Sequence, residues 1–351
     1  MRIVLTSVHC WPDVRRGGER YLHELAGGLV RAGHHVQVLS TGQHPGSDVV
    51  LGAAVRRLPE RRLGRFGELE VQAAFGAQCL GRLAGPVLAG RWDVWHATST
   101  ADAAAAAVLG RTRRVRTVFT DHGFPARPSR DSRSDRRLHR LVVKEIGAYV
   151  CVSDAAAQYL ARDYGRTASV VPPGVVWGAH APATRDPRPT LLYSGSLTES
   201  RKGVSLLLAA ARELRTQVPD LQVWLAGPGR LDVDSDLVTR CGLLDDASLR
   251  AAYARAWVTV LPSTAESFGM TVVESMASGT PAVVLKGGGG PAEIVTPDTG
   301  VLADATQLVD GLADGLELSR RPTTVAACRD RARDFDWDAA VVPQLLALYA
   351  G

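Results

Sequence analysis

Hydrophobic residues recur along the chain as short runs rich in valine and isoleucine, and stretches with helical periodicity separate these runs. The alternation is typical of repeated βαβ units, whose strands form a parallel sheet covered by helices. In the first half, the runs predict strands at residues 2–8, 35–40, 93–97, 117–120, 149–152 and 169–171. A second series predicts strands at residues 190–194, 222–226, 258–261, 281–285 and 300–302. We therefore expect an α/β protein with two parallel sheets.

The clearest helical pattern covers residues 19–32, where apolar residues recur on one helical face and Gly33 follows at a position typical of a helix end. Residues 334–351 show a second amphipathic pattern, which includes Trp337 and Tyr349. The sequence leaves two placements open for this last helix. It either packs on the second half of the chain or crosses back to the first.

A chain of 351 residues is longer than one hydrophobic core usually organises, so two domains are expected. Residues 178–189 are rich in proline, alanine and charge, and this composition indicates a linker. The expected domains are residues 1–177 and 190–333, followed by the C-terminal helix at 334–351.

Charge is distributed unevenly between the two halves. The net charge is +5, but residues 1–176 hold 25 basic and 15 acidic residues, so the rest of the chain is acidic. A basic half attracts anions, so the first half of the chain could bind an anionic ligand or contact an anionic membrane peripherally. No nucleic-acid partner is expected. The near absence of lysine among the basic residues favours a GC-rich bacterial source.

No window approaches the roughly 18 to 20 apolar residues of a membrane-spanning helix. The N-terminus also lacks the long apolar stretch and cleavage site of a secretory signal. We expect a cytoplasmic protein, with room for a peripheral position at the inner face of the membrane.

Cysteines and acidic pairs give no metal pattern. The five cysteines are scattered without CxxC spacing, which indicates buried thiols: Cys10, Cys79, Cys151, Cys241 and Cys328. Aspartates with DxD spacing lie outside any predicted strand-end site: Asp232 and Asp234, and Asp334, Asp336 and Asp338. Neither a metal nor another cofactor is expected.

The most informative segment runs from residue 262 to 281 and reads PSTAESFGMTVVESMASGTP. A predicted strand ends before it, and Gly269 opens a predicted helix whose first backbone N–H groups have no partner inside the helix. Such a helix start is an anion site suited to a diphosphate. Glu266 lies in the loop and Glu274 about one turn inside the helix, so both carboxylates can face one ligand.

This segment resembles the signature of the family-4 retaining glycosyltransferases, in which seven residues separate two glutamates and Phe-Gly lies between them. The resemblance implies the GT-B architecture, two Rossmann-like domains facing a central cleft. It also implies that Glu266 contacts the hydroxyls of a donor sugar and that Glu274 binds the ribose of its nucleotide. The intervening positions are expected to line the donor site: Ser267, Phe268, Gly269 and Met270.

A second match to the family is the segment YSGSLTESRKGVSLLLAA at residues 193–210. By resemblance, Gly195 and Lys202 hold the donor diphosphate. The family usually has an arginine directly after the glycine, where this chain has Ser196. Arg201 is the candidate that compensates. The loop after Cys241 is expected to flank the nucleobase, with Gly242 and Leu244 as contacts.

Candidate residues in the first domain follow predicted strands. Arg16 precedes Gly17 and Gly18, a glycine pair that resembles the family's donor-phosphate loop and lets a backbone approach a ligand closely. His122 matches the family's active-site histidine beside the donor sugar. His96, together with Arg16, is a candidate for the acceptor pocket.

The resemblance implies a retaining enzyme that moves a sugar from a nucleotide-diphosphate sugar to a hydroxyl acceptor. His122, Glu266 and Lys202 are its expected catalytic residues. The acceptor is open between a small molecule such as an aminocyclitol, a glycan and a lipid. Two other functions also fit this fold: a sugar-nucleotide epimerase, and a nonenzymatic protein that binds nucleotide sugars.

Overall fold

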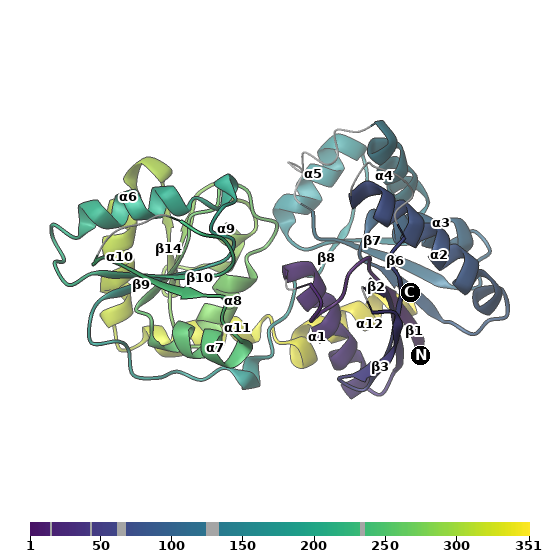
Figure 1. Ribbon diagram of the computed structural model, residues 1–351, viewed down its shortest axis with the longest axis horizontal. Helices are drawn as coiled ribbons and strands as arrows, with labels where there is room; N and C mark the ends of the chain where they lie inside the picture. The colour runs from purple at the N-terminus through teal and green to yellow at the C-terminus, as the bar shows by residue number, and fades with distance from the viewer. Residues whose placement is uncertain (15, 43, 62–67, 124–132, 232–235) are drawn as a thin grey trace. The chain divides into compact units, whose positions relative to one another are not determined.

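The computed structural model describes residues 1–14, 16–42, 44–61, 68–123, 133–231 and 236–351. The chain divides into two compact units. Unit 1 comprises Met1–Gly174 and Trp337–Gly351, and unit 2 comprises Val175–Asp336. Each unit is an α/β layer structure with one sheet, so the expected fold class is confirmed (Figure 1).

The expected linker at residues 178–189 is an irregular segment that packs on unit 2. Arg185 donates to the backbone carbonyls of Ala256 and Trp257 at 2.7 and 2.9 Å, and the indole of Trp257 donates to the carbonyl of Asp186. The chain passes between the units at Gly174 and again at Trp337. The sequence pattern missed these two points because neither has a composition typical of a linker.

The unit 1 sheet has the strand order β3-β4-β2-β1-β5-β6-β7-β8, and every pair is parallel except β3 with β4. Without the β3 edge and β8, this is the Rossmann order 3-2-1-4-5-6. Its strands are β1 (Arg2–Thr6), β2 (His35–Gly42), β3 (Gly46–Val50), β4 (Ala53–Pro59), β5 (Val94–Ala97), β6 (Arg116–Asp121), β7 (Ala148–Cys151) and β8 (Ser169–Val170).

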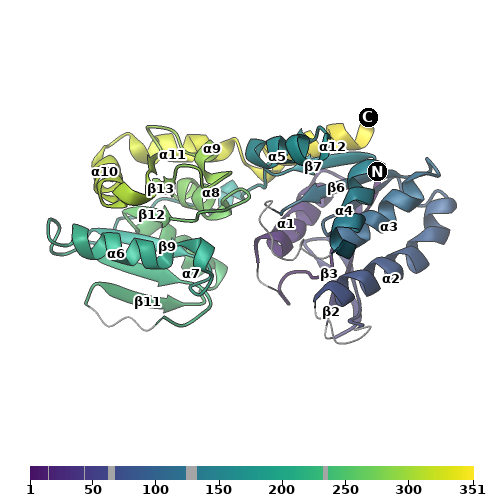
Figure 2. The same ribbon diagram turned by 90° about the horizontal axis from the view of Figure 1, so that it is seen from above.

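Helices cover both faces of the unit 1 sheet, with α2 and α3 on one face and α1 on the other (Figure 2). The C-terminal helix packs beside α1, where Leu345 and Tyr349 join Tyr21 and Leu25 in one hydrophobic core. The helices are α1 (Gly17–Arg31), α2 (Glu68–Leu88), α3 (Thr100–Gly110), α4 (Arg133–Glu145), α5 (Asp154–Tyr164), the π-helix η5 (Trp337–Val341) and α12 (Val342–Ala350). Of the two placements that the sequence left open, the structure adopts the crossing back to the first half.

Unit 2 has a fully parallel sheet in the order β11-β10-β9-β12-β13-β14, which is the complete Rossmann order. Its strands are β9 (Thr190–Ser194), β10 (Gln222–Ala226), β11 (Val238–Gly242), β12 (Val258–Leu261), β13 (Ala282–Leu285) and β14 (Gly300–Ala303). The runs at 190–194, 222–226 and 258–261 had predicted three of these strands with the observed bounds.

In unit 2, α6 and α10 share a core on one face of the sheet, and Figure 1 shows α6 above and α7 below the strands. The α-helices are α6 (Val204–Leu214), α7 (Asp246–Arg255), α8 (Met270–Ala277), α9 (Pro291–Ile294), α10 (Leu308–Arg320) and α11 (Thr324–Arg333). The short 3-10 helices are η2 (Trp177–Ala179), η3 (Ser200–Lys202) and η4 (Ala305–Gln307). Among the described residues, no helix combines the length and apolar character needed to cross a membrane.

Candidate functional site

The strongest candidate site lies in unit 2, at the carboxyl end of its sheet. The strand order reverses between β9 and β12, and open α/β sheets bind ligands at such a topological switch point. The loop after β9 leads to Lys202, and the loop after β12 holds Glu266. The fold therefore brings the two loops singled out by the sequence to one place.

Charged side chains from the two loops contact one another. Lys202 Nζ donates to Oε2 of Glu266, and the two side chains are 15% and 18% exposed. The Arg201 guanidinium lies 3.6 Å from the same carboxylate oxygen and donates to the carbonyl of Ala265 at 3.0 Å. Glu199 holds its other end at 2.6 Å. The loops thus carry two cations, Lys202 and Arg201, each of which is paired with a carboxylate. An incoming anion could take the place of these carboxylates.

Glycines allow the backbones of these loops to approach closely. Gly203 has a φ of 68°, and a Cβ there would overlap the carbonyl oxygen of Pro262. A Cβ on Gly227 would likewise overlap the carbonyl of Gly195. Gly227 is therefore required for packing between the loops after β9 and β10, whereas a Cβ on Gly195, whose φ is 155°, would lie 3.0 Å from the Tyr193 hydroxyl.

Helix α8 begins beside Glu266 without a side-chain cap. Gly269 precedes it with a φ of 105°, which favours glycine, and a glycine at this position has no side chain to cap the helix. Two nearby hydroxyl oxygens, Ser263 Oγ and Thr271 Oγ1, are buried and have no hydrogen-bond partner among the described residues. Buried polar atoms are normally paired, so these hydroxyls indicate a place for a polar ligand atom. Neither hydroxyl was among the predicted site residues, although each lies inside the signature segment.

The two signature glutamates differ in their surroundings. The backbone of Glu266 is fixed on both sides, because its N–H donates to Gly288 O at 2.8 Å and its carbonyl accepts from Gly290 N at 3.1 Å. Its carboxylate remains partly exposed. Glu274 lies in the middle of α8 and is only 5% exposed. The loop glutamate is thus presented to solvent, and the helical one is enclosed.

Other predicted donor residues lie in the loop after β9, at the end of β11 and in the loop that follows it. The Tyr193 phenol donates to the carbonyl of Ser196 at 2.7 Å, and burial, followed by the charge of Glu266, raises the pKa of Tyr193. Gly242 ends β11 with a φ of 68°, and its carbonyl accepts from Gly227 N at 2.8 Å. Leu244 is half-buried against the side of the sheet that carries α7.

Between the glutamates, Ser267 and Met270 are half-buried, whereas Phe268 is 6% exposed and packs edge-to-face on Phe335, 5.6 Å between ring centres. The ring of Phe268 therefore belongs to the core of unit 2. Its backbone, not its side chain, is what this position offers a ligand.

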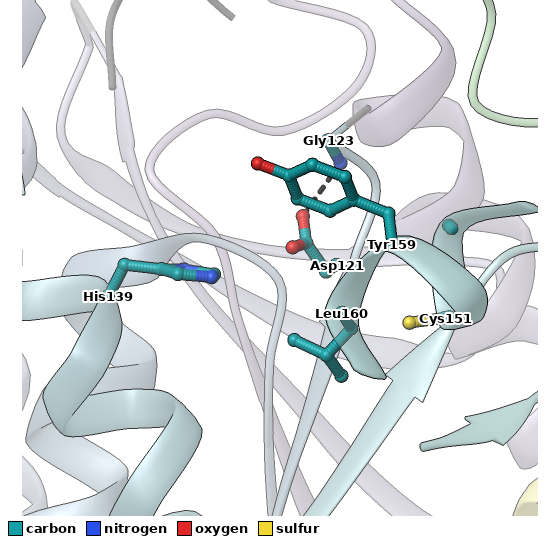
Figure 3. A pocket seen from close by; sticks show the side chains of 7 residues that line it. Asp121, Gly123, His139, Cys151, Tyr159 and Leu160 are labelled. Atoms are coloured by element: carbon teal, nitrogen blue, oxygen red, sulfur yellow. Dashed lines mark hydrogen bonds between the residues drawn. The ribbon is translucent and has the colours of Figure 1, made fainter. Parts of the chain in front are cut away.

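In unit 1, His122 directly follows β6 and is half-buried. Its ring contacts the ring edge of Tyr21, with 4.3 Å between centres. Asp121 fixes the turn around it by accepting from Gly123 N and from the Tyr149 hydroxyl, both at 2.7 Å. Figure 3 shows this carboxylate directed at the backbone nitrogen of Gly123. The ring of His122 is therefore contacted by Tyr21, and its turn is held by Asp121 and Tyr149. None of these three was among the predicted site residues.

The predicted glycine loop lies at the start of α1. Arg16 occupies the position before the helix, and Gly17 and Gly18 form its first turn, in which Gly17 is exposed and Gly18 is half-buried. A Cβ on Gly18 would meet no atom within 4 Å, so the fold of unit 1 does not itself require this glycine. The space at Gly18 is compatible with close approach of a ligand.

His96 does not line an open pocket, contrary to the expectation that it would contact an acceptor. Its side chain is 0% exposed, and its ring nitrogens bond Tyr349 and Thr120 at 2.6 and 2.7 Å. Burial lowers the pKa of His96 to about 3. The sequence missed this because one partner comes from the last helix of the chain.

Cysteines and aspartates have local structural surroundings. Cys241 is half-buried, and the other cysteines are buried and free. Asp334 pairs with Arg331 and Asp338 with Arg31. Asp232 and Asp234 lie outside the described residues. In the described part of the chain, no group of three His, Cys, Asp or Glu side chains is placed to hold a metal ion.

Known proteins resemble both units. The profile of the family described as Glycosyltransferase Family 4 matches residues 15–176, and the profile described as Glycosyl transferases group 1 matches residues 188–318. Glycogen synthase from Mycobacterium tuberculosis is 30% identical, over 96% of this chain and 92% of that protein.

Solved structures support the same fold. Sucrose-phosphate synthase from Thermosynechococcus elongatus superposes with a TM-score of 0.82 at 21% identity, over 99% of this chain and 98% of the other. HepE from Anabaena, in complex with UDP and glucose, gives a TM-score of 0.74 at 18% identity, over 99% and 98% of the two chains. At these identities the likeness shows the GT-B fold alone. Sequence and fold together show that this protein is a glycosyltransferase of family 4, within glycosyl transferases group 1.

Proposed function

We propose that the protein transfers a sugar, with retention of anomeric configuration, from a nucleotide-diphosphate sugar to a hydroxyl of an acceptor. The observation that carries the proposal is the meeting of Lys202, Glu266 and the open start of α8 at the switch point of unit 2. The structure of Anabaena HepE contains UDP and glucose, and the charges of this cluster suit ligands of that kind.

The charges of the cluster match the parts of such a donor. Lys202 and the N–H groups at the start of α8 supply positive charge for the diphosphate. Glu266 accepts hydrogen bonds from hydroxyls of the transferred sugar, and Glu274 from those of the ribose. Before the donor binds, Lys202 and Glu266 neutralise each other. The diphosphate replaces Glu266 as the partner of Lys202 and so releases the carboxylate for the sugar.

The same groups support the chemical step. As the bond from the sugar to the diphosphate breaks, negative charge grows on the departing phosphate oxygen, and Lys202 and the α8 amides stabilise it. That oxygen takes the proton of the attacking hydroxyl on the same face of the sugar, so no protein base is assigned. His122 is assigned to the transfer step by its match to the active-site histidine of the family. Because a lysine and backbone amides already meet the diphosphate charge, the transfer requires no metal.

Arg201 supplies the second cation in place of the arginine that Ser196 replaces. It lies next to Lys202 and within 3.6 Å of Glu266, so a small movement of its side chain reaches the same anion. Its pairing with Glu199 and its 46% exposure make it a weaker ligand than Lys202.

The acceptor is a small molecule, a glycan or a lipid. The names of the relatives, glycogen synthase and sucrose-phosphate synthase, show that this fold serves different acceptors. For a membrane-bound acceptor, the contact surface would be the depression of about 620 Å³ on unit 1, where Arg140 and Lys144 of α4 are exposed; Arg166, also in its lining, donates to the carbonyl of Ile146 at 2.8 Å. The chemistry there is electrostatic, so binding to anionic vesicles should weaken with salt.

One assay separates this function from its rivals. A panel of nucleotide sugars is incubated with and without candidate acceptors, and release of nucleoside diphosphate and the anomeric configuration of the product are measured. Transfer with retention is expected. An epimerase would consume the donor without any acceptor, and a nonenzymatic binding protein would bind a donor without turnover. An inverted product would show that the assigned mechanism is wrong.

A further inference from the structure

The C-terminal helix α12 is connected to the surroundings of His122 through buried side chains. Tyr349, near its end, is 5% exposed, and its hydroxyl bonds Nδ1 of His96 at 2.6 Å. Nε2 of His96 bonds the Thr120 hydroxyl at 2.7 Å. The Thr120 hydroxyl in turn lies 3.3 Å from that of Tyr21. A continuous chain of polar atoms therefore runs from α12 to Tyr21.

This series of hydrogen-bonded side chains reaches His122 by two routes, one through the backbone and one through a ring contact. Thr120 precedes His122 by two residues at the end of β6, so a fixed Thr120 side chain fixes the start of the turn. The ring of Tyr21 contacts the ring of His122, 4.3 Å between centres and steeply tilted. Both the backbone and the ring of the histidine are thus in contact with members of the chain.

A second residue of the returning segment holds Tyr21 from the other side. The Trp337 ring lies 5.3 Å from that of Tyr21. Its indole N–H donates to Glu24 at 2.6 Å, and Arg20 holds the same carboxylate at 2.8 Å. Tyr21, which is 0% exposed, therefore contacts the start of the C-terminal segment directly and is linked to its end through Thr120 and His96.

The side chains in this hydrogen-bonded series are uncharged. Burial lowers the pKa of His96 to about 3, and burial also raises the pKa values of the Tyr21 and Tyr349 phenols. Each member therefore stays neutral over the ordinary pH range. Such a chain acts through geometry: removal of one hydroxyl leaves a buried ring nitrogen without its partner, and the neighbours must shift to satisfy it.

We propose that Tyr349 and His96 are positioning residues, which hold Thr120, Tyr21 and through them the ring of His122 in the orientation needed for transfer. The inference rests on the proposed function, in which His122 is assigned to the transfer step. It gives the C-terminal helix a part in the active site of unit 1 beyond its part in the hydrophobic core.

The test compares Tyr349→Phe with Leu345→Ala in the full-length protein. The first removes a hydroxyl and keeps the ring, whereas the second removes core packing from the same helix at a residue that is 0% exposed. Tyr349→Phe should lower kcat by about 10-fold, below the roughly 100-fold that a misplacement of 1 Å costs, and change the KM for the donor by less than about 2-fold. Leu345→Ala should lower Tm at least as much and keep kcat. The proposal would be overturned if the loss of kcat followed the loss of Tm in both variants, or if kcat were unchanged in Tyr349→Phe.

A second readout does not depend on activity. The imidazole NMR signals of His122 are identified by their absence in His122→Asn, and they should shift in Tyr349→Phe but not in Leu345→Ala. If the wild-type protein turns over no nucleotide sugar, the proposed function fails, yet these signals still decide whether the chain positions the histidine. Unshifted signals overturn the inference. Thr120→Val, which removes the hydroxyl at the centre of the chain, replaces Tyr349→Phe if that variant does not fold.

Discussion

The two units share a strand order but build their candidate sites from opposite materials. In unit 2, Lys202, Arg201 and Glu266 are charged, partly exposed and paired with one another across two loops. In unit 1, the ring of His122 contacts that of Tyr21, and the nearby His96 is neutral and fully buried. Charged pairs near solvent exchange partners easily, whereas buried neutral hydrogen bonds resist rearrangement. Unit 2 is therefore suited to capture a charged ligand, and unit 1 to hold one ring still.

The largest effect is expected from removing the central cation of unit 2. Lys202→Ala should lower kcat/KM about 1000-fold, because a fixed positive charge at the departing phosphate is lost. Lys286→Ala is the matched control, since that lysine pairs with Asp304 on the exposed surface of the same unit. Steady-state kinetics measure both. A Lys202→Ala enzyme as active as the control would remove the basis for calling unit 2 the capture site.

Glu266→Gln should lower kcat about 100-fold by weakening a contact to the transferred sugar. Affinity for the free nucleoside diphosphate should not fall, because the same change frees Lys202 from its carboxylate partner. Calorimetric titration measures this affinity.

Glu274→Gln is the matched partner of that variant. It should weaken binding of the free nucleotide, since its carboxylate is assigned to the ribose. Equal loss of nucleotide affinity in both glutamine variants would refute the division of roles between the loop and the helix.

Arg201→Ala should cost about 1.5 kcal/mol, or about 10-fold in kcat/KM, as expected for one hydrogen bond to a charged group. The effect is smaller than that of Lys202 because Arg201 is half-exposed and shared with Glu199. Adding Ser196→Arg should restore part of the loss. If kcat/KM does not change in Arg201→Ala, the backbone amides and Lys202 suffice for the diphosphate.

The smallest effect concerns the stability of unit 1. Folded His96 has a pKa of about 3, but in the unfolded chain its pKa is ordinary, about 6.5. As pH falls below 6.5, the unfolded state binds a proton that the folded state does not, so stability decreases. Between pH 6.5 and 5.5 the loss should be about 1 kcal/mol. Urea unfolding should show this slope in the wild type and a shallower one in His96→Gln; identical slopes would contradict the buried neutral state.

The sequence predicted strands best where both faces are buried. The central strands β9, β10 and β12 are almost entirely buried, and the predicted bounds match the observed ones. It missed β11, an edge strand whose residues are mostly exposed, and the β3–β4 hairpin. In β4 the alternation of buried and exposed residues was present as a signal, but β3 is nearly all exposed and carries none.

The candidate site divides in the same way. The signature glutamates and Lys202 are legible because short segments carry their pattern. The support of His122 was not, because Tyr349 and His96 are 253 residues apart and only the folded chain brings them together. His96 itself looked like a site residue from its place after a strand, and the partner that buries it was invisible in its neighbourhood.

The two crossings between the units lie side by side. Val175 N donates to Phe335 O at 2.8 Å, Val175 pairs with Asp336, and a Cβ on Gly174 would press on the ring of Trp337. In the order of the chain, unit 2 is therefore an insertion within unit 1, entered and left at one spot. For protein engineering, residues 175–336 therefore form one segment that is joined to the rest of the chain at two adjacent junctions. Simple division of the chain after residue 174 would instead strip the first half of Trp337 and Tyr349.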